Sequence, residues 1–107
     1  MKRELFLNGL PDLLILRLLS RGEMYGYEIV AQINILSNDV LNFGEGCIYP
    51  ILHRMVAEGH LLQRSEVVEG RQRRYYRLSS SGRKQLATIN QRWSEVSGVV
   101  NKIESMV

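Results

Sequence analysis

Apolar residues recur at helical spacing in the first third of the chain. The segment from Leu10 to Leu19 is apolar at most positions, which predicts a helix buried on most sides. A second helix is predicted from about Tyr25 to Leu36, where Ile29, Ile33 and Leu36 recur at helical spacing with Val30 beside them. Two helices with apolar faces this wide require a shared core.

Helix ends and loops are marked by small polar residues. Asn8 can cap the first helix, and Ser20-Arg21-Gly22 ends it. Ser37-Asn38-Asp39 ends the second helix. Val40, Leu41 and Phe43 follow without a clear period, so we expect them to anchor the connecting loop against the core.

A third helix is predicted from near Gly46 to Glu58-Gly59, where glycine suits a left-handed cap. Pro50 is expected in its first turn, because proline inside a helix removes a backbone hydrogen bond. Ile48, Leu52 and Met55 repeat at four and three residues and so predict the core face. The other faces carry Cys47, Tyr49, Pro50, His53 and Arg54.

Two strand-like segments follow, Leu61 to Val68 and Gln72 to Leu78, with a turn around Glu69-Gly70-Arg71. If Leu78 points inward, Tyr76 packs beneath the hairpin, because alternate residues share a face. Three helices followed by a two-stranded ribbon are the winged form of the helix-turn-helix. The predicted fold is therefore mainly α with a small β-hairpin, a winged helix-turn-helix with a long C-terminal helix.

The last helix carries an apolar residue every three or four positions. The seam comprises Leu86, Ile89, Trp93, Val96, Val100, Ile103 and Val107. Such heptad spacing is typical of helices that pair, and Ser79, Ser80 or Ser81 can cap the start. We expect a homodimer, with packing on the first helix of the same chain as the alternative. The predicted organisation is a winged-helix DNA-binding domain at residues 1–80 and a dimerisation helix at 81–107, in one compact unit.

Length and composition narrow the class of protein. A chain of 107 residues has room for one modest core, and its single cysteine rules out an internal disulfide. The longest unbroken apolar run, Leu13 to Leu16, is far short of a membrane span, so no membrane partner is expected. The N-terminal segment does not resemble a secretory signal, and we expect a cytoplasmic protein.

The net charge of +3 is concentrated in one region. Residues 60–84 contain seven Lys or Arg and two Glu, a net charge of +5. Arg71, Arg73, Arg74 and Arg77 form the densest part, and we expect them to crowd one end of the domain. Localised positive charge favours a polyanion, which predicts double-stranded DNA as a partner; a solvated charged surface is the alternative.

Catalysis is not indicated. His53 and His60 have no partner pattern typical of a catalytic triad, and there is no glycine-rich phosphate loop. Two histidines and one cysteine do not form a metal-binding pattern either. We therefore predict a protein that is not an enzyme and has neither a metal site nor a cofactor.

Four short segments of the chain form a recognisable set: Tyr25-Gly26-Tyr27-Glu28-Ile29, Glu45-Gly46-Cys47-Ile48-Tyr49-Pro50-Ile51-Leu52, Glu58-Gly59-His60-Leu61 and Arg73-Arg74-Tyr75-Tyr76-Arg77-Leu78-Ser79. In this order and at this spacing, they resemble the PadR family of bacterial transcriptional regulators. The resemblance spans nearly the whole chain, and the short C-terminal part is similar to the smaller subgroup with a single dimerisation helix. It implies a homodimeric winged-helix repressor that regulates transcription by binding an inverted-repeat operator.

The resemblance also implies roles for particular residues. Residues 46–58 would form the recognition helix, with Tyr49 near the DNA backbone and Arg71 to Arg74 as the wing. The DNA-binding candidates are Tyr25, Cys47, Tyr49, Pro50, His53, Arg54, Arg71, Arg73 and Arg74. The dimer candidates are Leu86, Ile89, Trp93, Val96, Val100 and Ile103.

Three interpretations remain open at the sequence level. Trp93 is either interface packing or, as the resemblance implies, a contact for a small hydrophobic or aromatic effector. Cys47 is either a small filler or a thiol sensor in the first turn of its helix; many PadR members have threonine there. A winged helix can also serve as a protein-binding module without specific DNA binding, although such a wing has no need for four arginines.

Overall fold

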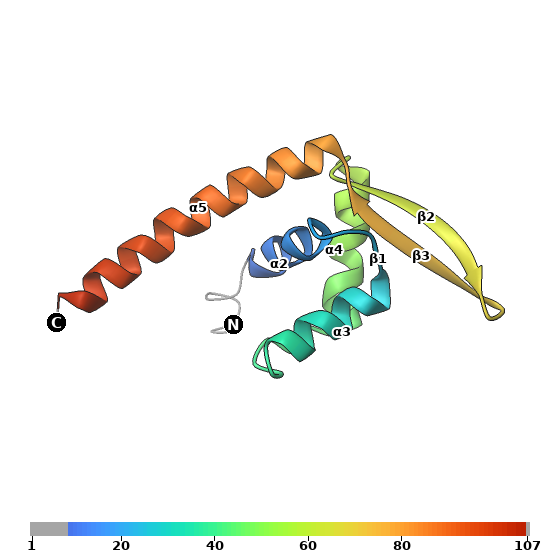
Figure 1. Cartoon of the computed structure of the whole chain (residues 1–107), viewed down its shortest axis with the longest axis horizontal. Coiled ribbons are helices and arrows are strands. Elements are labelled where there is room, and N and C mark those ends of the chain that lie inside the picture. Colours follow the sequence, from blue (N-terminus) through green and yellow to red (C-terminus); the bar gives the residue numbers. More distant parts are fainter. Residues whose placement is uncertain (1–8, 107) are drawn as a thin grey trace.

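Three helices form a bundle, a β-hairpin projects from one side, and a long C-terminal helix leaves the other (Figure 1). The computed structural model describes residues 9–106. In chain order the elements are α2 (Leu10–Leu19), β1 (Met24–Tyr25), α3 (Gly26–Leu36), α4 (Glu45–Ala57), β2 (Leu61–Val68), β3 (Arg71–Leu78) and α5 (Ser80–Ser105). The predicted order of helices and hairpin is confirmed.

One hydrophobic core joins the bundle to the base of the hairpin. Among residues 9–106, the largest fully buried side chains are Ile15, Leu16, Leu19, Ile29, Ile48, Leu52 and Leu61. The predicted core face of α4 is confirmed, because Ile48, Leu52 and Met55 are all buried. As a result the opposite faces of α4 remain available for other contacts.

The sheet has three strands in the order β1-β3-β2, rather than the two predicted. In β1, Met24 pairs with Tyr76 and Tyr25 with Tyr75. Two residues are too few to show the alternation by which a strand is recognised in a sequence. The added strand matters because it places Tyr25 beside the hairpin.

The hairpin itself agrees with the prediction. Glu69 and Gly70 both have positive φ, 51° and 79°, as a tight two-residue turn between twisted strands requires. Tyr76 and Leu78 are both buried, so Tyr76 does pack beneath the hairpin.

Two helix starts differ from the prediction. The N-cap of α2 is Gly9, and Asn8 lies outside the described residues. The start of α4 at Glu45 makes Pro50 its sixth residue, so the expected first-turn position is wrong. Proline cannot donate to the carbonyl of Gly46, four residues before it, but burial of Ile48 and Leu52 holds the helix on both sides of the lost bond.

The end of α3 and the loop after it are less buried than predicted. Phe43 is buried and Leu41 packs against the core, but Leu36 and Val40 are 62% and 80% exposed. Asn38 and Asp39 adopt left-handed backbone conformations there. These two residues turn the chain beyond the edge of the core, where no other described element covers Leu36 or Val40.

Helix α5 begins at the cap Ser79, whose hydroxyl oxygen accepts a hydrogen bond from the Gly82 N–H at 2.9 Å. Its first turns pack on the body: Leu86 and Ile89 contact the core, and Arg17 Nε donates to Asn90 Oδ1 at 2.8 Å. Farther along, the helix extends away from the bundle (Figure 1). Within residues 9–106, none of the helices has the length and apolar character that crossing a membrane requires.

Candidate nucleic-acid interface

A groove of about 750 Å³ lies between helix α4 and the hairpin. Residues from β1, α3, α4 and β3 line it: Tyr25, Gly26, Tyr27, Glu45, Tyr49, His53, Arg71, Gln72, Arg73, Arg74 and Tyr76. The groove thus combines aromatic rings, arginines and one carboxylate. The arginines give it the basic character that suits a phosphate backbone.

Tyr49 lies on the helix side of the groove, against the first residue of α3. A Cβ atom at Gly26 would be only 3.2 Å from Tyr49 Cε1, so glycine leaves room for the ring. Burial raises the pKa of the Tyr49 phenol above its ordinary value, and the charge of Glu45 adds to the shift. A tyrosine phenol is protonated at neutral pH even at its ordinary pKa, so Tyr49 can donate a hydrogen bond.

Arginines and tyrosines stack across the sheet on the hairpin side. The Arg73 guanidinium lies 4.5 Å from the centre of the Tyr25 ring, and the Arg64 guanidinium lies 4.4 Å from that of Tyr75. The two rings meet edge to face, with centroids 5.7 Å apart. Because these contacts join all three strands, they stabilise the orientation of the hairpin on the body.

Arg64 is also held by two carboxylates. It donates to Glu23 through Nε and Nη2, at 2.9 and 2.7 Å, and to Glu66 through Nη1 at 2.7 Å. The hydrogen bond from Arg64 lowers the pKa of Glu23 below its ordinary value. Arg64 counts toward the +5 of residues 60–84, but its charge is locally compensated.

Arg71 and Arg74 differ from Arg64 in this respect. Both side chains are exposed near the hairpin tip, and the ion pairs found among residues 9–106 include neither of them. Within the described part of the chain, these two arginines are well placed to meet an external anion.

The structure brings most of the DNA-binding candidates together. Six of them line the one groove: Tyr25, Tyr49, His53, Arg71, Arg73 and Arg74. Cys47 and Pro50 are exposed on α4 but do not line it. Tyr27, Glu45 and Gln72 also line the groove and were not predicted, although Tyr27 stands in the same short motif as Tyr25.

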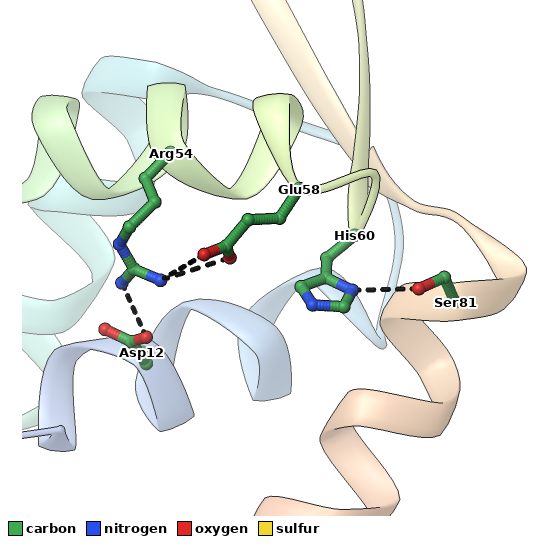
Figure 2. A network of polar contacts seen from close by, with 5 residues as sticks. All are labelled: Asp12, Arg54, Glu58, His60 and Ser81. Atoms are coloured by element: carbon green, nitrogen blue, oxygen red, sulfur yellow. Dashed lines mark hydrogen bonds and ion pairs between the residues drawn. The ribbon is translucent and has the colours of Figure 1, made fainter.

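Two expected arginines lie elsewhere. Arg54 does not line the groove, because its guanidinium is bound to Asp12 of α2 and Glu58 of α4 (Figure 2). Arg77 pairs with Leu62 near the base of the hairpin, so the four arginines do not crowd one end. Arg77 lies six positions beyond Arg71, and an extended strand covers roughly 20 Å over that length.

A second, more apolar groove of about 1080 Å³ runs between the start of α2 and the middle of α5. Leu10 and Leu13 line it from α2, and Ile89, Trp93 and Val96 from α5. Trp93 is 46% exposed, and Val96, Val100 and Ile103 beyond it are at least as exposed. The predicted seam is therefore divided: Leu86 and Ile89 pack within their own chain, whereas Trp93, Val96, Val100 and Ile103 remain about half exposed or more.

The chain matches a known family and many solved structures. The model of the transcriptional regulator PadR-like family matches residues 15–88. A structure of a transcriptional regulator from Clostridium thermocellum is similar, with a TM-score of 0.83 and 30% sequence identity over 91% of this chain and 95% of that one. A PadR-like transcriptional regulator from Bacillus cereus has a TM-score of 0.78 and 34% identity over 91% of this chain and 93% of that one.

A third similar structure contains nucleic acid. It is Bacillus subtilis PadR in complex with operator DNA, with a TM-score of 0.67 and 27% identity. The match covers 72% of this chain but only 44% of that one. The likeness is therefore to part of a longer protein.

Proposed function

Because the chain belongs to the PadR-like family of transcriptional regulators, we propose that it represses transcription by binding an inverted-repeat operator as a homodimer. The family is one of regulators and not of enzymes, as expected from the sequence. The observation that carries the proposal is the groove in which Tyr49 and His53 of α4 face Arg71, Arg73 and Arg74 of the hairpin.

In this proposal α4 is the recognition helix and the hairpin is the wing. His53 is the base-contact candidate on the helix, while Arg71 and Arg74 supply charge to the phosphate backbone. Tyr49 donates a hydrogen bond to a phosphate oxygen, because its phenol remains protonated. Bacillus subtilis PadR, similar over most of this chain, is seen with operator DNA, which supports the choice of partner.

The exposed part of α5 supports the dimer. Val96, Val100 and Ile103 are each at least half exposed, on a helix that extends away from its own body. A second copy would cover these side chains symmetrically. It would also bring two recognition helices to one face of DNA, about 34 Å apart if they enter successive major grooves.

The groove beside Trp93 supports a role for a small effector. Its walls are mostly apolar, and a planar aromatic compound could stack on the indole ring. An effector that binds one dimer shape better than another would shift the spacing of the recognition helices. We propose that such a compound releases the operator.

The test is selection of DNA from a random duplex library, followed by gel-shift titrations at about 50 and 200 mM salt. We expect enrichment of an inverted repeat and a steep loss of affinity with salt, because phosphate contacts release counterions. Arg71→Ala with Arg74→Ala should weaken binding to all sequences and flatten the salt slope by about one for each phosphate that is no longer neutralised.

The matched control is Arg77→Ala, which removes a charge at the base of the same strand. It should leave most of the salt slope intact. If the parent protein retards no duplex at low salt, the proposal fails and a winged helix that binds protein becomes the better explanation. If Arg77→Ala flattens the salt slope as much as the double variant does, the assignment of Arg71 and Arg74 as the wing tip is refuted.

A further inference from the structure

A second charged cluster joins α4 to α2, outside the groove. Arg54 Nη2 donates to Asp12 Oδ2 at 2.7 Å, and Arg54 Nη1 lies 3.2 Å from Glu58 Oε1. The hydrogen bond with Asp12 raises the pKa of Arg54 above its ordinary value. Figure 2 shows the guanidinium between the two carboxylates, with Asp12 reaching it from α2.

The geometry commits Arg54 to these carboxylates. Glu58, the C-cap residue of α4, is about one helical turn beyond Arg54 and holds the side chain along the helix. Asp12, 42 residues away in the sequence, then ties that side chain to the first turn of α2. Because Nη1 and Nη2 both bind carboxylates, one on α2 and one at the end of α4, the cluster fixes one helix against the other.

The position of α4 matters for the groove on its other side. Tyr49 and His53 are on α4, and a small rotation of the helix would move both relative to the wing. The residues that follow the C-terminal end of α4 are also tied down, since His60 Nδ1 lies 2.9 Å from Ser81 Oγ (Figure 2) and Ser79 Oγ donates to the Gly59 carbonyl at 2.6 Å. The Asp12 contact provides a polar tie between α2 and α4.

We propose that Asp12, Arg54 and Glu58 are positioning residues, through which α2 sets the orientation of the recognition helix. The inference rests on the proposed function and adds to it a determinant of sequence selectivity that does not touch DNA. It also changes the role of Arg54, from a DNA-binding candidate to a residue that anchors α4 on α2.

The two roles of Arg54 predict opposite changes in DNA affinity when Asp12 is replaced by Asn. If Arg54 read DNA, Asp12→Asn would release it and remove a negative charge, and both changes would tighten binding. If the cluster positions α4, Asp12→Asn weakens binding to the preferred sequence although it makes the protein more basic. An exposed ion pair of this kind corresponds to about a threefold loss per protomer, or about tenfold in a dimer.

The experiment compares Asp12→Asn and Arg54→Met with the parent, using the duplex the parent selects from a random library and a scrambled duplex of equal length. Asp39→Asn is the matched control, because it makes the same chemical change at an exposed loop residue. We expect both test variants to lose about tenfold for the selected duplex, to keep their affinity for the scrambled one, and to retain the salt slope. The double variant should lose no more than either single variant.

Each other outcome has a definite meaning. If Asp12→Asn binds the selected duplex as tightly as Asp39→Asn does, the inference is overturned. A purely stabilising role would reduce the active fraction and weaken both duplexes together, which would also overturn it. A parent protein that enriches no sequence would refute the proposed function, and this inference with it.

Discussion

Substitution of Val100 by Asp offers the most direct test of how the protein assembles. Val100 lies in the uncovered part of the α5 seam and is 60% exposed in the single chain. The neighbouring Asn101 is exposed and stands outside the heptad spacing. Asn101→Asp therefore introduces the same charge on the same turn without entering the seam.

The expected change in the dimer dissociation constant follows from the exposed surface of Val100 that a partner would bury. Full burial of a valine contributes about 1.5–3 kcal/mol, so covering the exposed 60% contributes about 1–2 kcal/mol per protomer. The residue occurs twice in a symmetric seam, and its loss would cost about 2–4 kcal/mol. Since each 1.4 kcal/mol is a factor of ten, the dimer dissociation constant should rise by about 30-fold to 1000-fold. Burying two carboxylates adds to this effect.

Light scattering or sedimentation over a range of protein concentrations measures the change. The parent and Asn101→Asp should be dimers at concentrations where Val100→Asp is a monomer. Circular dichroism should show that Val100→Asp keeps its helices, because the core side chains that hold α5 to the body, such as Leu86 and Ile89, are unchanged. Affinity for an inverted repeat should fall with the loss of dimer. An unchanged dimer of Val100→Asp at the lowest concentrations would refute the seam as the interface.

Two further predictions concern single side chains. Planar aromatic compounds that bind the groove between α2 and α5 should quench the fluorescence of Trp93, the only tryptophan, and weaken operator binding at the same concentrations. Trp93→Ala should abolish the effect of these compounds on DNA binding while leaving a dimer. Quenching without any change in DNA affinity would refute the effector proposal. The carboxyl of Glu23 should titrate below the ordinary glutamate range, because Arg64 donates to it. Its contribution to stability is then present at the ordinary glutamate pKa and above and is lost as the pH falls below it. Arg64→Met should raise the pKa of Glu23, measured by NMR, toward its ordinary value, and a parent value already in the ordinary range would contradict the ion pair.

Much of the fold was predictable because its signals are local. The core face of α4 is an apolar repeat within one helix, the hairpin turn needs a glycine at positive φ, and the cap of α5 is a serine at the expected place. The strand β1 was missed, because two residues carry no periodic signal and become a strand only by pairing with β3. The exposure of Leu36 and Val40 was missed for a similar reason, since spacing indicates which face is apolar but not how far the core extends.

For the candidate site, too, local features were predictable and contacts between distant residues were not. The sequence alone determined that a basic hairpin follows a helix with spare polar and aromatic faces, and that an apolar seam runs along the last helix. Which arginines meet carboxylates depends on contacts that form only when the chain folds. Arg54 and Arg64 find Asp12 and Glu23, 42 and 41 residues away, whereas no ion pair within the described chain involves Arg71 or Arg74. Charge counted along a chain sums every arginine equally, but the field at a surface depends on which opposite charges folding has placed within a few ångströms.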